Sequence, residues 1–421
     1  MGVAPASGLT TQNAATYSLA SSSDTDISLH LVDRDAAMTV AKGAFVEIRK
    51  LVAPALAVLL LAGVGGGVWF SNRGVVDERS AQQQARLKQA QQVSVRGLIG
   101  SEKEAFFADA RVVAALAKQG ITLTVEKAGS RAIALRFDAS KYDFGFPSGA
   151  PAAVQLRTAA KASNVFNPFY TPMVLASWRP IAEILVANGV AQRQGDFYYI
   201  VDLPGLMAMV EQGTRWRELK KSEAFATSKS VLVNSTDVRT SNSAAMYLSL
   251  ASYLANNQQI VQSQEDVDRV LPRVAPLFLR QGFQEQSSAG PFEDYLALGM
   301  GKAPLLMAYE SQMVEYWLKH PAKVGKGSDM VLMYPKPTVY SKHVLVPYTP
   351  AGERLGAALE SDPVVRDLAH EYGFRTGGDK RGPELWAQRG VVVPDVVVDV
   401  IDPPSQEWLE KMIVAIEARF K

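Results

Sequence analysis

The sequence predicts an α/β fold, because apolar strand patterns alternate with helix patterns from residue 93 to the C-terminus. The alternating run 93–100 indicates a strand, and an amphipathic helix pattern follows it as far as Gly120. A second strand pattern, 121–129, completes a β–α–β unit. The chain has 421 residues, of which 48% are apolar and 20% charged, so it has ample material for a core.

Short sequence signals predict where the individual helices begin. Ser101 followed by Glu104 predicts a capping box at the start of the first helix, and Asp362 followed by Pro363 predicts the start of a late one. Ser405 is the expected cap of a final amphipathic helix. Further strands are expected at 142–149, 167–177, 231–233, 301–309, 330–335 and 343–348, and further helices at 178–189 and 244–254.

Composition excludes several classes of function. The formal net charge is +2 with no long Lys/Arg block, which gives no case for nucleic-acid binding. The absence of cysteine removes disulfides, thiolate metal sites and a lipidated Cys anchor. The four histidines are scattered without ligand spacing, so neither a metal site nor a cofactor is expected. The length after residue 92 exceeds one typical domain and predicts one large bilobed unit.

The N-terminal part predicts a membrane anchor. The run 51–70 carries no charge and would span roughly 30 Å as a helix, about the thickness of a bilayer core. Residues 1–50 indicate a disordered tail, and 71–92 a polar stalk. An uncleaved signal anchor is favoured over a cleaved signal peptide, because the long preceding segment and the missing A-x-A site do not fit the latter.

The flanking charges favour a cytoplasmic N-terminus only weakly. Three basic residues stand in the fifteen positions before the run and two in the fifteen after it. The expected location is a bacterial cell membrane, crossed once, with the large domain outside the cytoplasm.

Small polar clusters fall where strand patterns pass into helix patterns. They are 100–101, 129–131, 147–149, 240–243 and 287–288. Free backbone N–H groups at helix starts, with Ser hydroxyls beside them, can bind anions or polar ligands. Each cluster alone also fits ordinary helix capping, but five of them at the same expected sheet edge point to a ligand site.

The order of these motifs resembles a known family. GSEKEAFF, GSRAIA, DFGFPSG, FNPFYTPMVLASW, STDVRTSNSAAMYLSL, GKAPLLMAYESQ and GERLGAALESDPVVRDLAHEYGF follow one another between residues 93 and 375. In this order they are similar to type II extracellular solute-binding proteins of ABC importers, nearest the molybdate- and sulfate-type branch. Two departures are the missing lipidated Cys and the unmatched C-terminal stretch after residue 375.

The resemblance implies a two-lobed clamp with a ligand cleft. It divides the chain into lobe 1, about 93–175 plus 335–421, and lobe 2, about 176–334. The residues that it implies for ligand binding are Ser101, Ser130, Arg131, Ser148, Ser241, Asn242, Ser243 and Tyr309. Arg131 could instead form an inter-lobe salt bridge, and Glu310 fits better as a structural group or the partner of an Arg.

Three functions remain open. The first is a membrane-anchored protein that captures a small polar or anionic solute, without catalysis, and passes it to an ABC permease. The second is a sensor or scaffold in which the same fold serves a membrane or envelope protein. An enzyme is least favoured, because no G-x-S-x-G elbow occurs and the candidate carboxylates Asp143, Glu310 and Glu315 are not spaced for one helical face.

Overall fold

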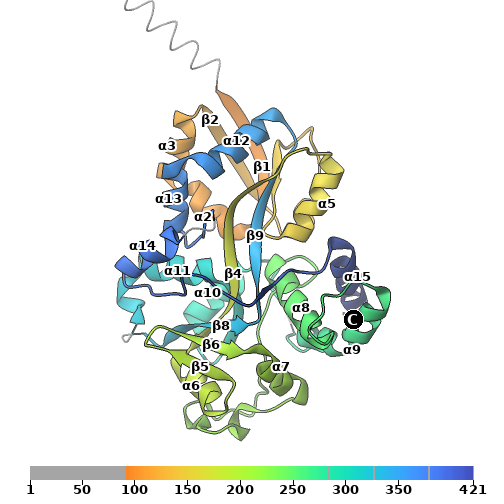
Figure 1. The fold of residues 1–421 in the computed structure, drawn as a ribbon, viewed down its shortest axis with the longest axis vertical. Helices are drawn as coiled ribbons and strands as arrows, with labels where there is room; N and C mark the ends of the chain where they lie inside the picture. The colour runs from red at the N-terminus through yellow and green to blue at the C-terminus, as the bar shows by residue number, and fades with distance from the viewer. Residues whose placement is uncertain (1–91, 283, 326–327, 378–379, 421) are drawn as a thin grey trace, which may run out of the picture. The chain divides into compact units, whose positions relative to one another are not determined.

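The computed structural model describes residues 92–282, 284–325, 328–377 and 380–420. They form two lobes joined by two long strands, β4 and β9 (Figure 1). The strands are β1 (Val93–Ile99), β2 (Ile121–Lys127), β3 (Phe144–Phe146), β4 (Phe166–Trp178), β5 (Ala191–Gln194), β6 (Tyr198–Asp202), β7 (Leu305–Tyr309), β8 (Met330–Lys336), β9 (Thr338–Pro347) and β10 (Val400–Ile401).

Helices cover both faces of the sheets. They are α2 (Glu104–Ala108), α3 (Ala110–Lys118), α4 (Ser130–Leu135), α5 (Ala150–Ala160), α6 (Arg179–Ala187), α7 (Leu203–Gln212), α8 (Asn242–Ala255), α9 (Gln264–Leu279), α10 (Ala289–Leu298), α11 (Glu310–Lys319), α12 (Pro350–Ser361), α13 (Pro363–Glu371), α14 (Arg381–Gln388) and α15 (Gln406–Glu417).

The two lobes have separate strand sets. Lobe 1 is built on the order β2-β1-β3-β9, in which β1 is parallel to β2 and β3 while β9 runs antiparallel to β3. Lobe 2 is built on the second half of β4, which pairs antiparallel with β7 and β8, and on β6 and β5 beyond β8. The first half of β4 pairs with β9, so these two strands connect the lobes.

The period-2 pattern of the connecting strands explains why each sheet is buried on both faces. In β4, Leu175 contributes to one apolar core of lobe 2, and its neighbours Val174 and Ala176 contribute to the core on the opposite face. In β9, Leu345 and Val344 divide in the same way between the two cores of lobe 1. Within these strands, the stretches 173–176 and 344–346 are therefore continuously apolar.

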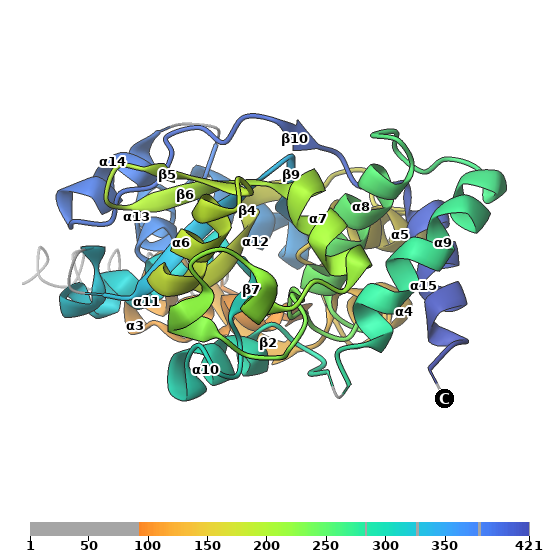
Figure 2. The same ribbon diagram turned by 90° about the horizontal axis from the view of Figure 1, so that it is seen from below.

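The C-terminal segment passes from lobe 1 to lobe 2. After α14 the chain forms β10, which pairs in parallel with the start of β9, and ends in α15 beside α8 and α9 (Figures 1 and 2). Leu409, Met412 and Ile413 of α15 lie in the apolar core of lobe 2. The sequence division had grouped residues 335–421 with lobe 1, but the packing of α15 is with lobe 2.

The predicted α/β class is confirmed, and so are most of the expected elements. The capping box was wrong: Ser101 opens a 3-10 turn with no side-chain cap, and Asp109 separates α2 from α3, accepting a hydrogen bond from the Arg111 N–H. The strand expected at 231–233 is also wrong, because this segment lies between isolated bridges at Ser230 and Asn234.

The predicted tail, membrane span and most of the stalk lie outside the described residues, which begin at 92. Within the described ranges, no helix is both long enough and apolar enough to cross a bilayer. The single-pass anchor at 51–70 therefore stays a prediction.

Candidate ligand site between the lobes

Asn242, the first residue of α8 in lobe 2, reaches across to lobe 1. Its Nδ2 lies 2.9 Å from the carbonyl oxygen of Ser148, 3.1 Å from the Tyr309 hydroxyl and 3.1 Å from the Ser341 hydroxyl. Ser148 lies in the turn that follows β3 in lobe 1, and Tyr309 is the last residue of β7 in lobe 2. One buried amide thus connects both lobes and the connecting strand β9.

Two glycines allow this close approach. A Cβ on Gly129 would lie 2.4 Å from the carbonyl oxygen of Thr240, and a Cβ on Gly149 would lie 2.0 Å from Oδ1 of Asn242. Any side chain at either position would push the facing backbone or amide away. The two lobes therefore meet in a closed arrangement at this edge.

Hydroxyl groups surround the amide. Ser130, at the start of α4, accepts a hydrogen bond from the backbone N–H of Ser148 at 2.9 Å. In lobe 2, the Ser243 hydroxyl lies 2.7 Å from that of Thr236 and 3.1 Å from that of Ser241. These hydroxyls can donate or accept, so they suit a polar ligand without fixing its charge.

A buried charged cluster lies behind the hydroxyls. The Lys103 side chain is fully buried, with its Nζ 2.9 Å from the Ser148 hydroxyl and in an ion pair with Glu102. The Glu102 carboxylate also accepts from the Ser148 hydroxyl. Burial acts to raise the pKa of the Glu102 carboxyl, but the Lys103 and His343 charges and the hydrogen bonds from Lys103 and Ser148 together lower that pKa to about 2.

His343 of β9 completes the cluster. Its Nδ1 lies 3.2 Å from Nζ of Lys103, and its side chain is fully buried. An ammonium only donates, so Nδ1 accepts and the ring proton is on Nε2. Burial lowers the pKa of His343 to about 3, and the Lys103 charge acts in the same direction. Nε2 has no hydrogen-bond partner among the described residues.

The free space at this site is small. The cavity has a volume of about 10 Å³, which is about enough for one water molecule. It is lined by Gly100, Ser101, Glu102, Ala128, Gly129, Ser130, Ser241, Asn242, Gln286, Ser287, Ser288 and Tyr309. Ser148 and Ser243 lie next to this lining through the contacts given above. Seven of the eight predicted site residues therefore gather at one place, and their role in binding stays a prediction.

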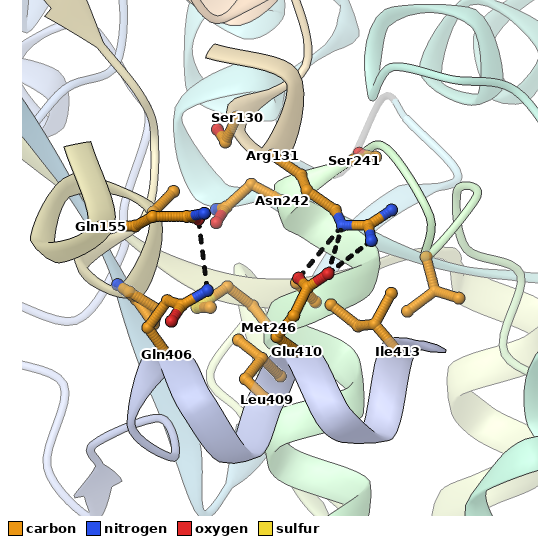
Figure 3. A pocket seen from close by; sticks show the side chains of 14 residues that line it. Ser130, Arg131, Gln155, Ser241, Asn242, Met246, Gln406, Leu409, Glu410 and Ile413 are labelled. Atoms are coloured by element: carbon orange, nitrogen blue, oxygen red, sulfur yellow. Dashed lines mark hydrogen bonds and ion pairs between the residues drawn. The ribbon is translucent and has the colours of Figure 1, made fainter. Parts of the chain in front are cut away.

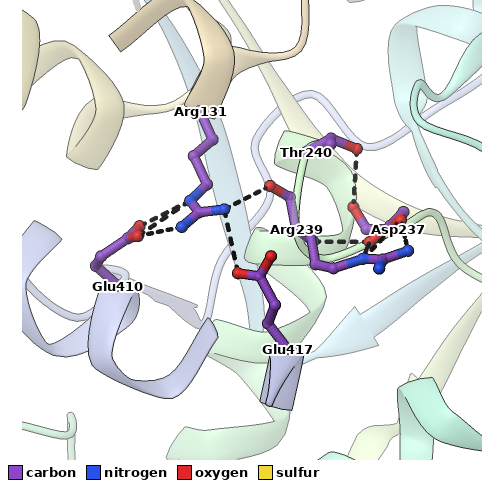
Figure 4. A network of polar contacts seen from close by, with 6 residues as sticks. All are labelled: Arg131, Asp237, Arg239, Thr240, Glu410 and Glu417. Atoms are coloured by element: carbon purple, nitrogen blue, oxygen red, sulfur yellow. Dashed lines mark hydrogen bonds and ion pairs between the residues drawn. The ribbon is translucent and has the colours of Figure 1, made fainter. Parts of the chain in front are cut away.

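Arg131 points elsewhere. Its guanidinium forms a two-pronged ion pair with Glu410 of α15, approaches Glu417 at 3.6 Å and donates to the carbonyl oxygen of Arg239 at 3.0 Å (Figure 4). Gln406 of α15 also reaches Gln155 of α5 at 3.2 Å (Figure 3). These contacts match the alternative in which Arg131 serves a salt bridge.

Together they make α15 a strap across the lobes. Its apolar side packs in lobe 2, its polar side holds α4 and α5 of lobe 1, and a cavity of about 40 Å³ remains beneath it (Figure 3). The strap lies beside the same helix starts, α4 and α8, that line the inter-lobe site.

The strap contact leads to a stability prediction. A double-mutant cycle of Arg131→Gln and Glu410→Gln should give a coupling energy of about 1 kcal/mol, since the pair is only partly exposed and two-pronged. Urea unfolding of the four proteins measures it. Lys127 and Glu104, both half-exposed, form the matched control pair, whose coupling should be under about 0.5 kcal/mol. Equal couplings would contradict the strap.

The charged half of the site was not predicted from the sequence. Glu102 and Lys103 stand in the motif GSEKEAFF, where they read as the exposed first turn of a helix. The only signal for His343 was its place two residues after Ser341 in a strand. Glu310 was better anticipated: it pairs with Arg375, as a structural group would.

In the part of the chain that the structure describes, no group of three or more His, Asp or Glu side chains could hold a metal ion. No protein-family model and no curated protein matches the chain.

Solved structures do match. The sulfate-binding protein SubI from Mycobacterium tuberculosis H37Rv is 15% identical, covering 71% of this chain and 86% of its own, with a TM-score of 0.40. The periplasmic molybdate-binding protein from Azotobacter vinelandii is 12% identical, covering 67% and 99%, with a TM-score of 0.40. The periplasmic binding protein AfuA from Actinobacillus pleuropneumoniae, with fructose-6-phosphate bound, is 10% identical, covering 76% and 97%, with a TM-score of 0.48.

At such identities these matches concern the fold alone. The two lobes, the connecting strands β4 and β9 and the order β2-β1-β3-β9 are properties of this chain itself. The chain is similar to type II periplasmic solute-binding proteins, sulfate- and molybdate-binding ones among them.

Proposed function

We propose that the chain is a membrane-anchored, extracytoplasmic solute-binding protein. It captures a small polar or anionic solute between its lobes, without catalysis, and delivers it to an ABC importer. The observation that carries the proposal is the convergence of Asn242 from lobe 2 with Ser130 and Ser148 from lobe 1 on one buried polar site. Polar groups from two separately packed lobes meet there, as a hinged clamp requires.

A solute screen tests the capture step. The purified 421-residue chain is heated with a panel of sugars, amino acids, polyamines and inorganic anions, and native mass spectrometry records what it carries from its host. A solute present at 100 times its dissociation constant should stabilise the fold by about 2.7 kcal/mol, so its melting temperature rises. Asn242→Ala should abolish that rise. A panel without any effect, together with a ligand-free mass spectrum, would contradict solute capture.

The anchor is the second part of the proposal. The uncharged run 51–70 would hold the clamp at the membrane, in the place of the lipidated Cys that this chain lacks. Protease added to intact spheroplasts should digest residues 93–421, because the lobes face outward in this arrangement. Protection of these residues until the membrane is broken would overturn the orientation.

One observation favours a second function, a sensor or scaffold for a membrane or envelope protein. The inter-lobe cavity is only about 10 Å³ and the strap α15 holds both lobes together, as a protein that stays closed would require. Cross-linking in the native membrane separates the two functions. An ABC permease among the partners favours delivery, and a regulatory or envelope protein favours the scaffold.

A further inference from the structure

We propose that Glu102 is a built-in anion of the inter-lobe site and restricts it to solutes without net negative charge. The inference rests on the proposed solute-binding function and names the class of solute: a small neutral or cationic molecule that donates hydrogen bonds. Deprotonated oxyanions such as sulfate and molybdate are excluded, although the fold resembles proteins that bind them.

The contacts of Glu102 are those that a bound anion would make. Its carboxylate accepts from the Ser148 hydroxyl and pairs with the Lys103 ammonium, and the side chain is 5% exposed. A Cβ on Gly100 would lie 2.5 Å and 2.7 Å from its two carboxylate oxygens, so the carboxylate lies directly against the backbone of the turn. The chain itself fills the anion position.

The charges around the cavity point the same way. Glu102 is the only charged side chain among the described residues that line it, and Lys103 behind it is already paired. His343 is neutral, because its Nδ1 accepts from Lys103. A second anion would therefore add an uncompensated negative charge to a buried site, which is costly. A hydroxyl or ammonium group can instead donate to the carboxylate.

Two substitutions test this inference. Glu102→Ala removes the heavy atoms of one acetate ion and leaves Lys103 without its counter-ion. Glu102→Gln removes the charge while keeping the shape. The matched control is Glu104→Gln, two residues further along, whose side chain is 52% exposed and pairs with Lys127. Each 421-residue protein is titrated with sodium sulfate, molybdate and acetate, with sodium chloride of equal ionic strength as reference.

Both Glu102 variants should gain binding of at least one of the three anions. An anion at about ten times its dissociation constant then raises their melting temperature by about 2–4 °C over chloride. Wild type and Glu104→Gln should show no such rise. If Glu102→Ala does not fold in chloride, recovery of folding in acetate supports the inference, and Glu102→Gln decides it where acetate does not help.

The inference is overturned if wild type binds sulfate or molybdate as tightly as the variants, or if neither variant responds to any anion. These outcomes are separate from failure of the proposed function. If wild type binds a neutral or cationic solute but the variants bind no anion, the proposed function holds and the role of Glu102 does not. If the variants gain anion binding while wild type binds no solute, Glu102 still occupies the anion position, but the protein is a scaffold and not a solute-binding protein.

Discussion

Replacing Glu310 with Gln should lower the free energy of unfolding by about 3–5 kcal/mol, because it leaves the buried guanidinium of Arg375 without its carboxylate. Arg375 Nε lies 2.7 Å and its second terminal nitrogen 2.9 Å from the two oxygens of Glu310, and both side chains are almost fully buried. Tyr334 donates to the same carboxylate at 2.6 Å. Urea unfolding of the 421-residue chain measures the loss.

The loss should extend beyond this pair. Arg375 also donates to the carbonyl oxygens of Pro394 and Asp395, at 2.8 Å each, and so holds the segment that leads to β10 and α15. Hydrogen exchange at residues 391–401 should therefore speed up in Glu310→Gln. The control Glu104→Gln breaks a half-exposed pair and should cost under about 1 kcal/mol without changing exchange there. Similar losses in both variants would show that Glu310 is not a structural anchor.

The strands were predictable because their signal is local. Period-2 or continuous apolar runs set β1, β2, β4 and β7, and glycines with positive φ end helices where the sequence suggested, as at Gly120 and Gly373. The hydroxyl half of the site was predictable for a related reason. Residues such as Ser130 and Asn242 stand at strand-to-helix junctions, which an α/β sheet gathers at one edge.

The charged half was not predictable, because distant residues decide it. Besides its neighbour Glu102, the buried Lys103 contacts Ser148 and His343, which lie 45 and 240 residues away in sequence. A lysine next to a glutamate is far more often exposed. Arg131 pairs with Glu410, which lies 279 residues away in sequence. The sequence alone therefore could not decide whether Arg131 binds a ligand or forms a salt bridge.

Acidification should destabilise the fold through His343. The folded pKa is lowered to about 3 from an ordinary value of 6.5, because the ring is buried and lies beside the Lys103 ammonium. At a pH between these two values, His343 is protonated in the unfolded chain and neutral in the folded chain. The stability that the neutral ring provides is thus fully present above about pH 6.5 and is lost as the pH falls toward 3, by up to about 1.4 kcal/mol per pH unit.

The charges near the ring only partly offset one another. The Glu102 carboxylate lies 3.6 Å from Nδ1 and acts to raise the pKa of His343, but burial and the Lys103 ammonium, which is itself paired with Glu102, lower it further. The remaining neighbours are aromatic: Phe146, Tyr309 and Phe374 lie with ring centroids 5.2–6.5 Å from the imidazole. A protonated ring would therefore place a second positive charge next to Lys103, where both side chains are fully buried.

Urea unfolding of wild type and His343→Gln from pH 7.5 to pH 4.5 separates this contribution from all others. The glutamine does not titrate, so the difference in unfolding free energy between the two proteins should change with pH, in favour of the variant at low pH. His320→Gln, at the exposed end of α11, controls for the loss of an imidazole as such. A constant difference between wild type and His343→Gln over this range would mean that His343 takes up its proton in the folded state. The cluster around Lys103 would then have to open without unfolding the lobes, and the closed site would be an acid-labile one.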